Sequence, residues 1–189
     1  AHDFGCRVAW YFAMDDRSKS RVERLVVINI THPRGVSRAL ANQTPEQAEG
    51  SAYARILVDP EQEAAAIELL AGAIDLRMTT WWNDQDPAIT EFVNEANART
   101  SVQSIAHWYQ ANYFRQPYKE LTGFPQVEMP VLQIHGLADP AVTKEGLANT
   151  SDWVDGEYTL VTYPGVGHIP HLQVPDRVNA ALRAWLESH

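Results

Sequence analysis

The sequence predicts an α/β fold: a mostly parallel sheet with flanking helices and one inserted helical block. Three apolar runs, at residues 25–28, 131–135 and 158–163, each lead into a turn that presents a polar side chain. That pattern is typical of strands in a parallel sheet. Between the first and second runs, residues 34–126 are helical in pattern and contain no strand candidate of any length.

A further observation comes from the start of the chain, residues 1–6. Small residues, Ala1 and Gly5, lie two places either side of Asp3, and a helical pattern follows. A sharp strand-to-helix turn requires small neighbours because it crowds the backbone and exposes the central side chain above the sheet. A carboxylate there attacks saturated carbon and leaves an ester, which favours ring opening or halide displacement over ordinary ester hydrolysis. A terminal turn with Asp3 as helix cap fits the same residues.

Two more polar residues follow predicted strands. Asp139 lies in the turn after the run at 131–135, and His168 lies in a Gly-rich turn after the run at 158–163. Nucleophile, acid and histidine therefore occur in that order, each just after a strand. This is the chain order of the α/β-hydrolase catalytic triad.

On these residues the chain resembles the α/β-hydrolase superfamily, and specifically its epoxide hydrolase-like branch. The elbow of that branch commonly reads Gly-His-Asp-Trp-Gly, where this chain has Ala-His-Asp-Phe-Gly at residues 1–5. Similar segments are Asn-Ile-Thr-His-Pro at 29–33, and Gly-His at 167–168 followed by a helix start at Val-Pro, 174–175. The resemblance covers essentially the whole chain.

The resemblance also implies a domain organisation. A partial α/β-hydrolase core would comprise residues 1–33 and 127–189, with a helical lid inserted at 34–126. The first strands of the family, and a loop that completes its oxyanion hole, would precede Ala1. We therefore expect roughly a hundred residues of a complete domain to be missing from the N-terminal side.

The lid is expected to supply hydrogen-bond donors to the substrate. Epoxide hydrolases use two lid tyrosines that bind the epoxide oxygen, and the resemblance implies that Tyr53 is the first. The second belongs to a motif close to Asn-Trp-Tyr-Arg, where this chain has Asn-Tyr-Phe-Arg at 112–115, so Phe114 occupies its position. Tyr109 and Tyr113 are possible substitutes in the pocket, although Tyr113 on a helix would point about 100° away from Phe114.

The resemblance then implies a mechanism for opening an apolar epoxide to a diol. Asp3 attacks a ring carbon to form an alkyl-enzyme ester, while Tyr53 hydrogen-bonds the leaving oxygen. His168, oriented by Asp139, activates the water that hydrolyses the ester. The backbone N–H of Phe4, the residue after the nucleophile, would donate to the ester's oxyanion. No metal or organic cofactor is expected.

Capping residues mark the expected helix starts within residues 34–126. Thr44 and Thr100 are each followed three places later by Gln, which is a capping box. Asp-Pro pairs at 59–60 and 86–87 each combine an N-cap with Pro at the first helical position.

Two other helices are expected to cover the sheet. The elbow helix would pack on it through an apolar surface that includes Val8, Trp10, Tyr11 and Phe12. The last helix, opening at Pro175, would do so through a stripe at Val178, Ala181, Leu182, Trp185 and Leu186.

The remaining histidines have no ligand pattern. No second ligand lies at metal-binding spacing from His32, which favours a structural role. His171 and His189 are expected to be exposed.

Composition limits the other classes of function. Fifteen Lys and Arg against 24 Asp and Glu give a formal charge of −9, which disfavours binding to nucleic acid or an anionic membrane. A single cysteine, Cys6, excludes an internal disulfide and a Cys-based zinc site. No apolar run is long enough to span a bilayer. A cytoplasmic location is favoured, and the oligomeric state is open.

Two alternatives to epoxide opening remain. A haloalkane dehalogenase would share the nucleophile, base and lid, but such enzymes usually place Trp after the nucleophile, and here that residue is Phe4. Trp81, Trp82 or Trp108 of the lid could not easily replace it. The other alternative is a truncated, non-catalytic binding module of the same fold.

Overall fold

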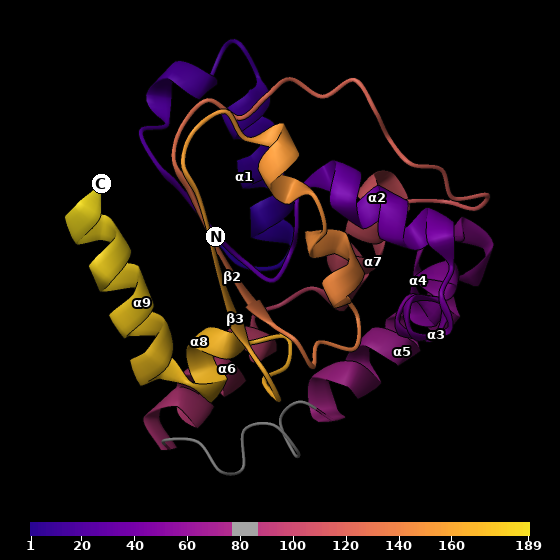
Figure 1. The fold of residues 1–189 in the computed structure, drawn as a ribbon. Helices are drawn as coiled ribbons and strands as arrows, with labels where there is room; N and C mark the ends of the chain where they lie inside the picture. Colours follow the sequence, from indigo (N-terminus) through magenta and orange to yellow (C-terminus); the bar gives the residue numbers. More distant parts are fainter. Residues whose placement is uncertain (77–86) are drawn as a thin grey trace. The chain divides into compact units, whose positions relative to one another are not determined.

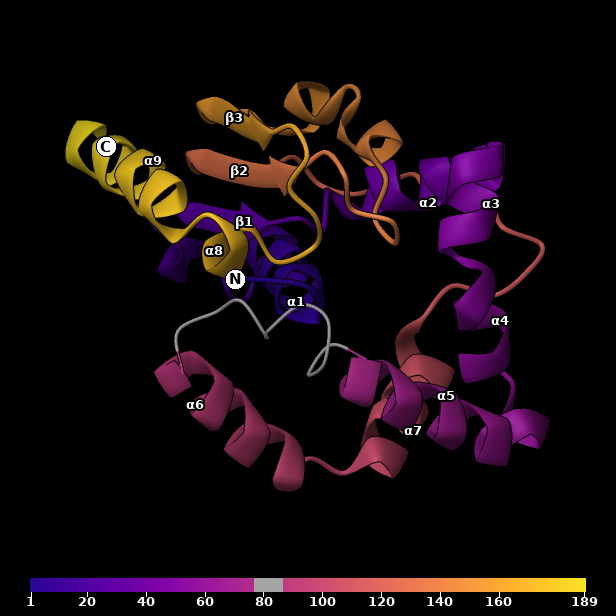
Figure 2. The ribbon, with the colours of Figure 1, turned by 90° about the horizontal axis from the view of Figure 1, so that it is seen from below.

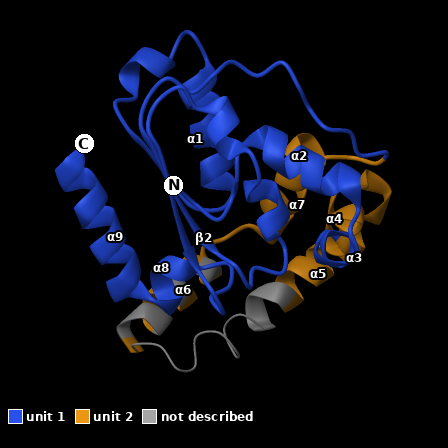
Figure 3. Cartoon of the chain, viewed as in Figure 1, with its two compact units in different colours: residues 1–51, 117–189 blue, residues 52–116 orange. Residues whose placement is uncertain are grey.

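The computed structural model describes residues 1–76 and 87–189 (Figure 1). The described chain forms two compact units, coloured separately in Figure 3: unit 1 is Ala1–Ser51 with Pro117–His189, and unit 2 is Ala52–Gln116. The expected lid boundaries differ from this division, since residues 34–51 and 117–126 fall in unit 1. The reason for the first difference is that α2 (Pro33–Asn42) packs against the 3-10 turn Lys144–Leu147.

Unit 1 contains a three-stranded, fully parallel sheet in the order β1, β2, β3 (Figure 2). The strands are β1 (Leu25–Ile28), β2 (Val131–Gly136) and β3 (Tyr158–Tyr163), which confirms the three predicted strands and their parallel arrangement. β2 is buried along its whole length. Val131 packs with residues of the helix Phe4–Met14, and Leu132 and Ile134 pack with residues of the helix Pro175–Ser188. Beside β1, an isolated parallel bridge joins Ile28 to His2, so the residue before Asp3 runs alongside the sheet.

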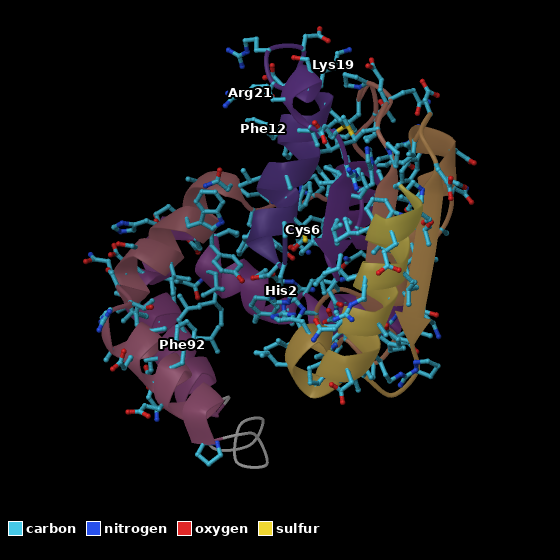
Figure 4. The ribbon with its side chains drawn as sticks, turned by 90° about the vertical axis from the view of Figure 1, so that its left-hand side faces the viewer. His2, Cys6, Phe12, Lys19, Arg21 and Phe92 are labelled. Atoms are coloured by element: carbon cyan, nitrogen blue, oxygen red, sulfur yellow. The ribbon has the colours of Figure 1, made fainter. Side chains whose placement is uncertain are left out.

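The elbow helix α1 (Phe4–Met14) packs on the sheet through a different face from the one expected. Its buried residues include Cys6 and Trp10, whereas Val8 and Phe12 are 53% and 41% exposed. Figure 4 labels Cys6 and Phe12 on this helix. Val8 lies two residues after Cys6, about 200° around the helix, and therefore points away from the core. The predicted burial of Val8, Tyr11 and Phe12 is wrong; the buried face is Cys6, Trp10, Ala13 and Met14.

The C-terminal helices α8 (Pro170–Gln173) and α9 (Pro175–Ser188) also belong to unit 1. Val178 and Trp185 of α9 are buried as expected, but Leu186 is 44% exposed. Leu186 lies about 80° around the helix from Val178, at the border of the buried stripe. The expectation that His189 is exposed is wrong, because its ring stacks on Trp185 with centroids 4.5 Å apart.

The caps of the remaining helices largely follow the sequence. Thr44 accepts from the N–H of Gln47. Asp59 accepts from the N–H of Glu61, but it caps the 3-10 turn Pro60–Gln62 rather than an α-helix. The cap of α7 is a correction: Ser101, rather than Thr100, accepts from Ser104, so the helix begins one residue later. Asp86 lies outside the described residues. These helices are α3 (Pro45–Gly50) in unit 1, and α4 (Ala52–Leu57), α5 (Glu63–Leu76), α6 (Pro87–Ala98) and α7 (Val102–Asn112) in unit 2.

His32 is part of the core of unit 1. Its ring lies among those of Trp10, Phe124 and Trp153, at centroid distances of 5.2, 5.6 and 4.9 Å. Nδ1 accepts the N–H of Arg34 at 3.2 Å, which leaves the ring proton on Nε2. Burial, assisted by the charge of Arg34, lowers the pKa of His32 to about 4. The folded protein therefore holds this ring neutral.

We expect acid to destabilise the fold through His32. The pKa of His32 in the folded protein lies below the ordinary value of 6.5. Its contribution to the free energy of unfolding is therefore complete above pH 6.5 and is lost as the pH falls toward 4. The loss in unfolding free energy amounts to at most about 3 kcal/mol. Urea unfolding at about pH 7.5 and about pH 4.5 measures it.

The control for this prediction is His32→Asn. Asn keeps a side-chain acceptor at the N-cap of α2 and removes the titrating ring. Other titrating groups, including His171, remain in both proteins, so their effects cancel in the comparison. The variant should be less stable near neutral pH but lose less stability on acidification. Equal pH dependence in the two proteins would contradict the account.

Candidate active site

Asp3 occupies a strained turn between the residues beside β1 and helix α1. Its backbone has φ 49° and ψ −131°, a conformation that residues other than glycine rarely adopt. Gly5 lies beside Ala1 across this turn, and a Cβ atom added at Gly5 would make an ordinary van der Waals contact with the Cβ of Ala1, at 3.8 Å. The backbone N–H of Phe4 donates a hydrogen bond to the Asp3 carboxylate. The turn leads directly into α1 and leaves the Asp3 side chain partly exposed.

His168 lies between two carboxylates. Its Nδ1 lies 2.6 Å from Oδ2 of Asp139, and its Nε2 lies 3.4 Å from Oδ1 of Asp3. The Asp139 side chain is completely buried, that of His168 is 12% exposed, and that of Asp3 is 41% exposed. The three residues that the sequence places after separate strands therefore meet at one point, and Asp3 is the member of the group most open to solvent.

Asp139 is held by four hydrogen bonds. Its Oδ1 accepts from the backbone N–H groups of Ala141 and Val142 at 2.8 and 3.0 Å. Its Oδ2 accepts from Asn29 Nδ2 and from His168 Nδ1, both at 2.6 Å. Burial would raise the pKa of Asp139, but His168 and these other donors outweigh burial and hold that pKa below its ordinary value. Asp139 is therefore a fixed anion that orients the His168 ring.

The charges of the group are strongly coupled. Burial would lower the pKa of His168, but its hydrogen bonds to Asp139 and Asp3, together with their charges, raise that pKa to about 9. Burial would likewise raise the pKa of Asp3, but His168, His2 and the N–H of Phe4 bring it below the ordinary value. At neutral pH the unreacted site thus holds an imidazolium between two carboxylates.

Two further histidines surround the His168 loop. Nε2 of His2 lies 2.8 Å from the backbone oxygen of His168, and the His2 ring lies 5.0 Å from the His168 ring and 4.6 Å from that of His171. Figure 4 shows His2 beside the start of α1. His171 is partly buried, so its expected exposure is wrong, and burial lowers its pKa to about 4.

Sequence reasoning missed two residues of this site, His2 and Asn29. Both lie within the segments that resemble the family, but neither was given a role. Asn29 could have been found from its place in the sequence, because it directly follows β1 just as Asp139 and His168 follow the next two strands. Polar residues after parallel strands meet at one edge of the sheet.

The aromatic candidates for the pocket lie in unit 2. The ring of Tyr53, in α4, lies 6.2 Å from that of Tyr109, which lies 5.5 Å from Tyr113. Tyr113 lies 5.8 Å from Phe114. The helical argument about Tyr113 is wrong, since α7 ends at Asn112 and Tyr113 is extended. Tyr109 is thus in ring contact with Tyr53. Trp81 and Trp82 lie outside the described residues.

No metal centre or membrane helix is found in the described parts of the chain. Residues 1–76 and 87–189 contain no group of three or more His, Cys, Asp or Glu side chains that could hold a metal ion. Over the same residues, no helix has the length and apolar character needed to cross a membrane.

Comparison with known proteins identifies the fold. No family model and no curated protein matches the chain. Solved structures do match, and they have the α/β-hydrolase fold. One is an epoxide hydrolase of the α/β-hydrolase superfamily from metagenomes of hot environments, which is 26% identical with a TM-score of 0.74 and is matched over 100% of this chain and 66% of its own. The chain therefore has part of the α/β-hydrolase fold.

Other solved structures show the same likeness. An epoxide hydrolase from Bacillus megaterium, with a bound diol product, is 22% identical with a TM-score of 0.81, over 98% of this chain and 67% of its own. A thermophilic esterase from Thermogutta terrifontis is 19% identical with a TM-score of 0.61, over 99% and 63%. The chain thus spans about two thirds of the length of the structures that it matches.

Proposed function

We propose that this chain belongs to a hydrolase that opens epoxides to diols through an ester of Asp3. The observation that best supports the proposal is that a carboxylate, rather than a hydroxyl, occupies the strained elbow position within reach of His168. A hydroxyl nucleophile attacks acyl groups, whereas a carboxylate displaces oxygen from a saturated carbon. The similarity in fold to several epoxide hydrolases agrees with this chemistry.

The reaction divides into two steps. In the first, an Asp3 oxygen forms a bond to a ring carbon, the ring C–O bond breaks, and the departing oxygen takes a proton from Tyr53. In the second, His168 Nε2 removes a proton from water as the water oxygen adds to the ester carbonyl carbon. The N–H of Phe4 donates to the resulting oxyanion. As the intermediate collapses, the bond between the carbonyl carbon and the diol oxygen breaks and that oxygen takes the proton of the added hydroxyl, which releases the diol and regenerates the Asp3 carboxylate beside protonated His168.

The charge coupling within the site explains how His168 serves as a base. In the unreacted site His168 is protonated at neutral pH, because its pKa is about 9. Ester formation removes the charge of Asp3 and with it one of the two carboxylates that raise this pKa. The pKa of His168 then falls, its proton can restore Tyr53, and the neutral ring is available to activate water. Alkylation thus prepares the base for the second step.

The test of the proposal is diol formation from a terminal aryl epoxide by the protein and by Asp3→Asn. Asn has nearly the same shape but no anionic oxygen, so we expect the rate of diol formation to fall by about 10³-fold or more. Asp16→Asn, which changes an exposed carboxylate near the far end of α1, is the matched control and should leave the rate unchanged.

Halide release from a primary haloalkane is measured in parallel. Diol formation without halide release supports epoxide opening, and halide release without diol formation supports the dehalogenase alternative. Absence of both activities, with no Asp3 adduct formed by either substrate, supports a non-catalytic module. Either of these last two results overturns the proposal.

A further inference from the structure

Asn29 occupies a demanding position directly after β1. Its side chain is completely buried, and its backbone has φ 68°, in the left-handed region. Asn tolerates that region better than most residues. The backbone N–H of Asn29 donates to the oxygen of Ile134 at 2.9 Å, so the residue is still anchored to the neighbouring strand β2. Its side chain is thereby aimed at a fixed point of the site.

Both the nitrogen and the oxygen of the Asn29 side-chain amide form hydrogen bonds. Nδ2 donates to Asp139 Oδ2 at 2.6 Å and to the backbone oxygen of Gly167 at 3.3 Å, while Oδ1 accepts the N–H of Gly136 at 3.1 Å. The partners determine the orientation of the amide. If the amide nitrogen and oxygen were exchanged, the amide N–H groups would face the N–H of Gly136 and the amide oxygen would face the carboxylate of Asp139, so neither hydrogen bond could form.

These contacts hold the surroundings of His168 from two sides. The Oδ2 atom that accepts from Asn29 is the one that accepts from His168 Nδ1, and Gly167 directly precedes His168 in the chain. A donor on Oδ2 makes that oxygen less basic, which keeps the shared proton on the imidazole ring. The amide also fixes the plane of the carboxylate relative to the ring.

We propose that Asn29 is a positioning residue for His168, acting through Asp139 and Gly167. It sets the orientation of the imidazole and the pKa at which that ring loses its proton. This assignment rests on the proposed function, in which His168 activates the water that hydrolyses the ester of Asp3.

Two substitutions separate the amide from the backbone. Asn29→Asp keeps the shape, the tolerance of left-handed backbone and an acceptor for Gly136, but it replaces the two N–H donors by an oxygen. Asn29→Gly keeps the backbone without strain and removes the whole amide. The matched controls are Asn149→Asp and Asn149→Gly, because Asn149 also has a left-handed backbone, φ 59°, but its side chain is exposed.

The first measurement needs no substrate: the pKa of His168 by NMR in histidine-labelled protein. In Asn29→Asp the introduced carboxyl group faces Asp139. The added negative charge should raise the pKa of His168 by at least about 1. Asn29→Gly should also change this pKa, and both Asn149 controls should leave it unchanged. An unchanged His168 pKa in folded Asn29→Asp and Asn29→Gly would overturn the assignment, whatever reaction the protein catalyses.

The second measurement is single-turnover kinetics with an epoxide. Ester hydrolysis should slow about 10-fold to 100-fold in both Asn29 variants, with alkylation less affected, because only hydrolysis requires neutral His168. In Asn29→Asp the pH dependence of hydrolysis should move in the same direction as the pKa of His168. Equal slowing of both steps with an unmoved pH profile would indicate a purely structural residue and contradict the proposal. If no ester forms in the unchanged protein, the proposed function fails, but the NMR result still decides the role of Asn29.

Discussion

In His168→Gln, we expect the ester of Asp3 to form and then persist. Asp3 remains ionised without the imidazolium, because its 41% exposed side chain retains solvent and the N–H of Phe4. Alkylation should therefore slow only modestly, whereas ester hydrolysis loses its base and should fall by about 10²-fold to 10⁴-fold. Rapid quenching after mixing with excess epoxide should show one equivalent of alkylated protein and almost no diol.

The control for this experiment is His107→Gln. This is the same substitution at a histidine of unit 2, which is exposed and contacts Glu63 of that unit. It should leave both steps unchanged. Diol release from His168→Gln at the rate of the unchanged protein would show that another group activates water. His2 is the nearest candidate by ring contact, at 5.0 Å from His168.

In Tyr53→Phe, we expect the first step rather than the second to fail. Opening of the ring develops negative charge on the departing oxygen, and loss of a hydrogen-bond donor at such an oxygen costs about 10²-fold to 10³-fold in rate. Alkylation of Asp3 should fall by that factor while hydrolysis of an ester already formed is unaffected. Single-turnover kinetics resolves the two steps.

The ring contact between Tyr53 and Tyr109 makes Tyr109 the best candidate for a second donor. Tyr109→Phe should then slow alkylation as well, and Tyr11→Phe, on the exposed face of α1, should not. Phe114→Tyr should raise the rate about 10-fold to 100-fold if a well-aligned hydroxyl at that position can act. Unchanged alkylation in Tyr53→Phe combined with a large loss in Tyr113→Phe would assign the donor to Tyr113 instead. No effect from any of these changes would favour halide displacement.

Local patterns were enough to predict the three strands and the starts of α3 and α9. The bounds of β1 and β3 follow the apolar runs, and the caps at Thr44 and Asp59 follow from side chains that bond N–H groups two or three residues away. The buried face of α1 was mispredicted because apolar residues surround that helix, so their presence alone does not tell which ones face the sheet. Angles measured from Cys6 would have separated Val8 from Trp10.

The candidate site was predictable to the extent that its members follow strands. Asp139 and His168 were found in this way, and Asp3 was found from its small neighbours Ala1 and Gly5. The structure places a carboxylate oxygen of Asp139 and one of Asp3 at 2.6 and 3.4 Å from the two nitrogens of the His168 ring. The place of Asn29 directly after β1 could have been used in the same way, but its particular partners, Asp139, Gly167 and Gly136, were not predictable. Such contacts depend on the order of strands in the sheet, which local patterns do not specify.

The most direct test of the central claim, that Asp3 is the nucleophile, is a single turnover of excess protein with an epoxide in ¹⁸O-labelled water. If the ester forms and water adds to its carbonyl carbon, the diol takes its new oxygen from the original Asp3 carboxylate and the label enters Asp3. Mass spectrometry should then find ¹⁸O in the peptide that contains Asp3 and unlabelled diol. Labelled diol with unlabelled Asp3 would show that water attacks the epoxide directly, and would contradict the account.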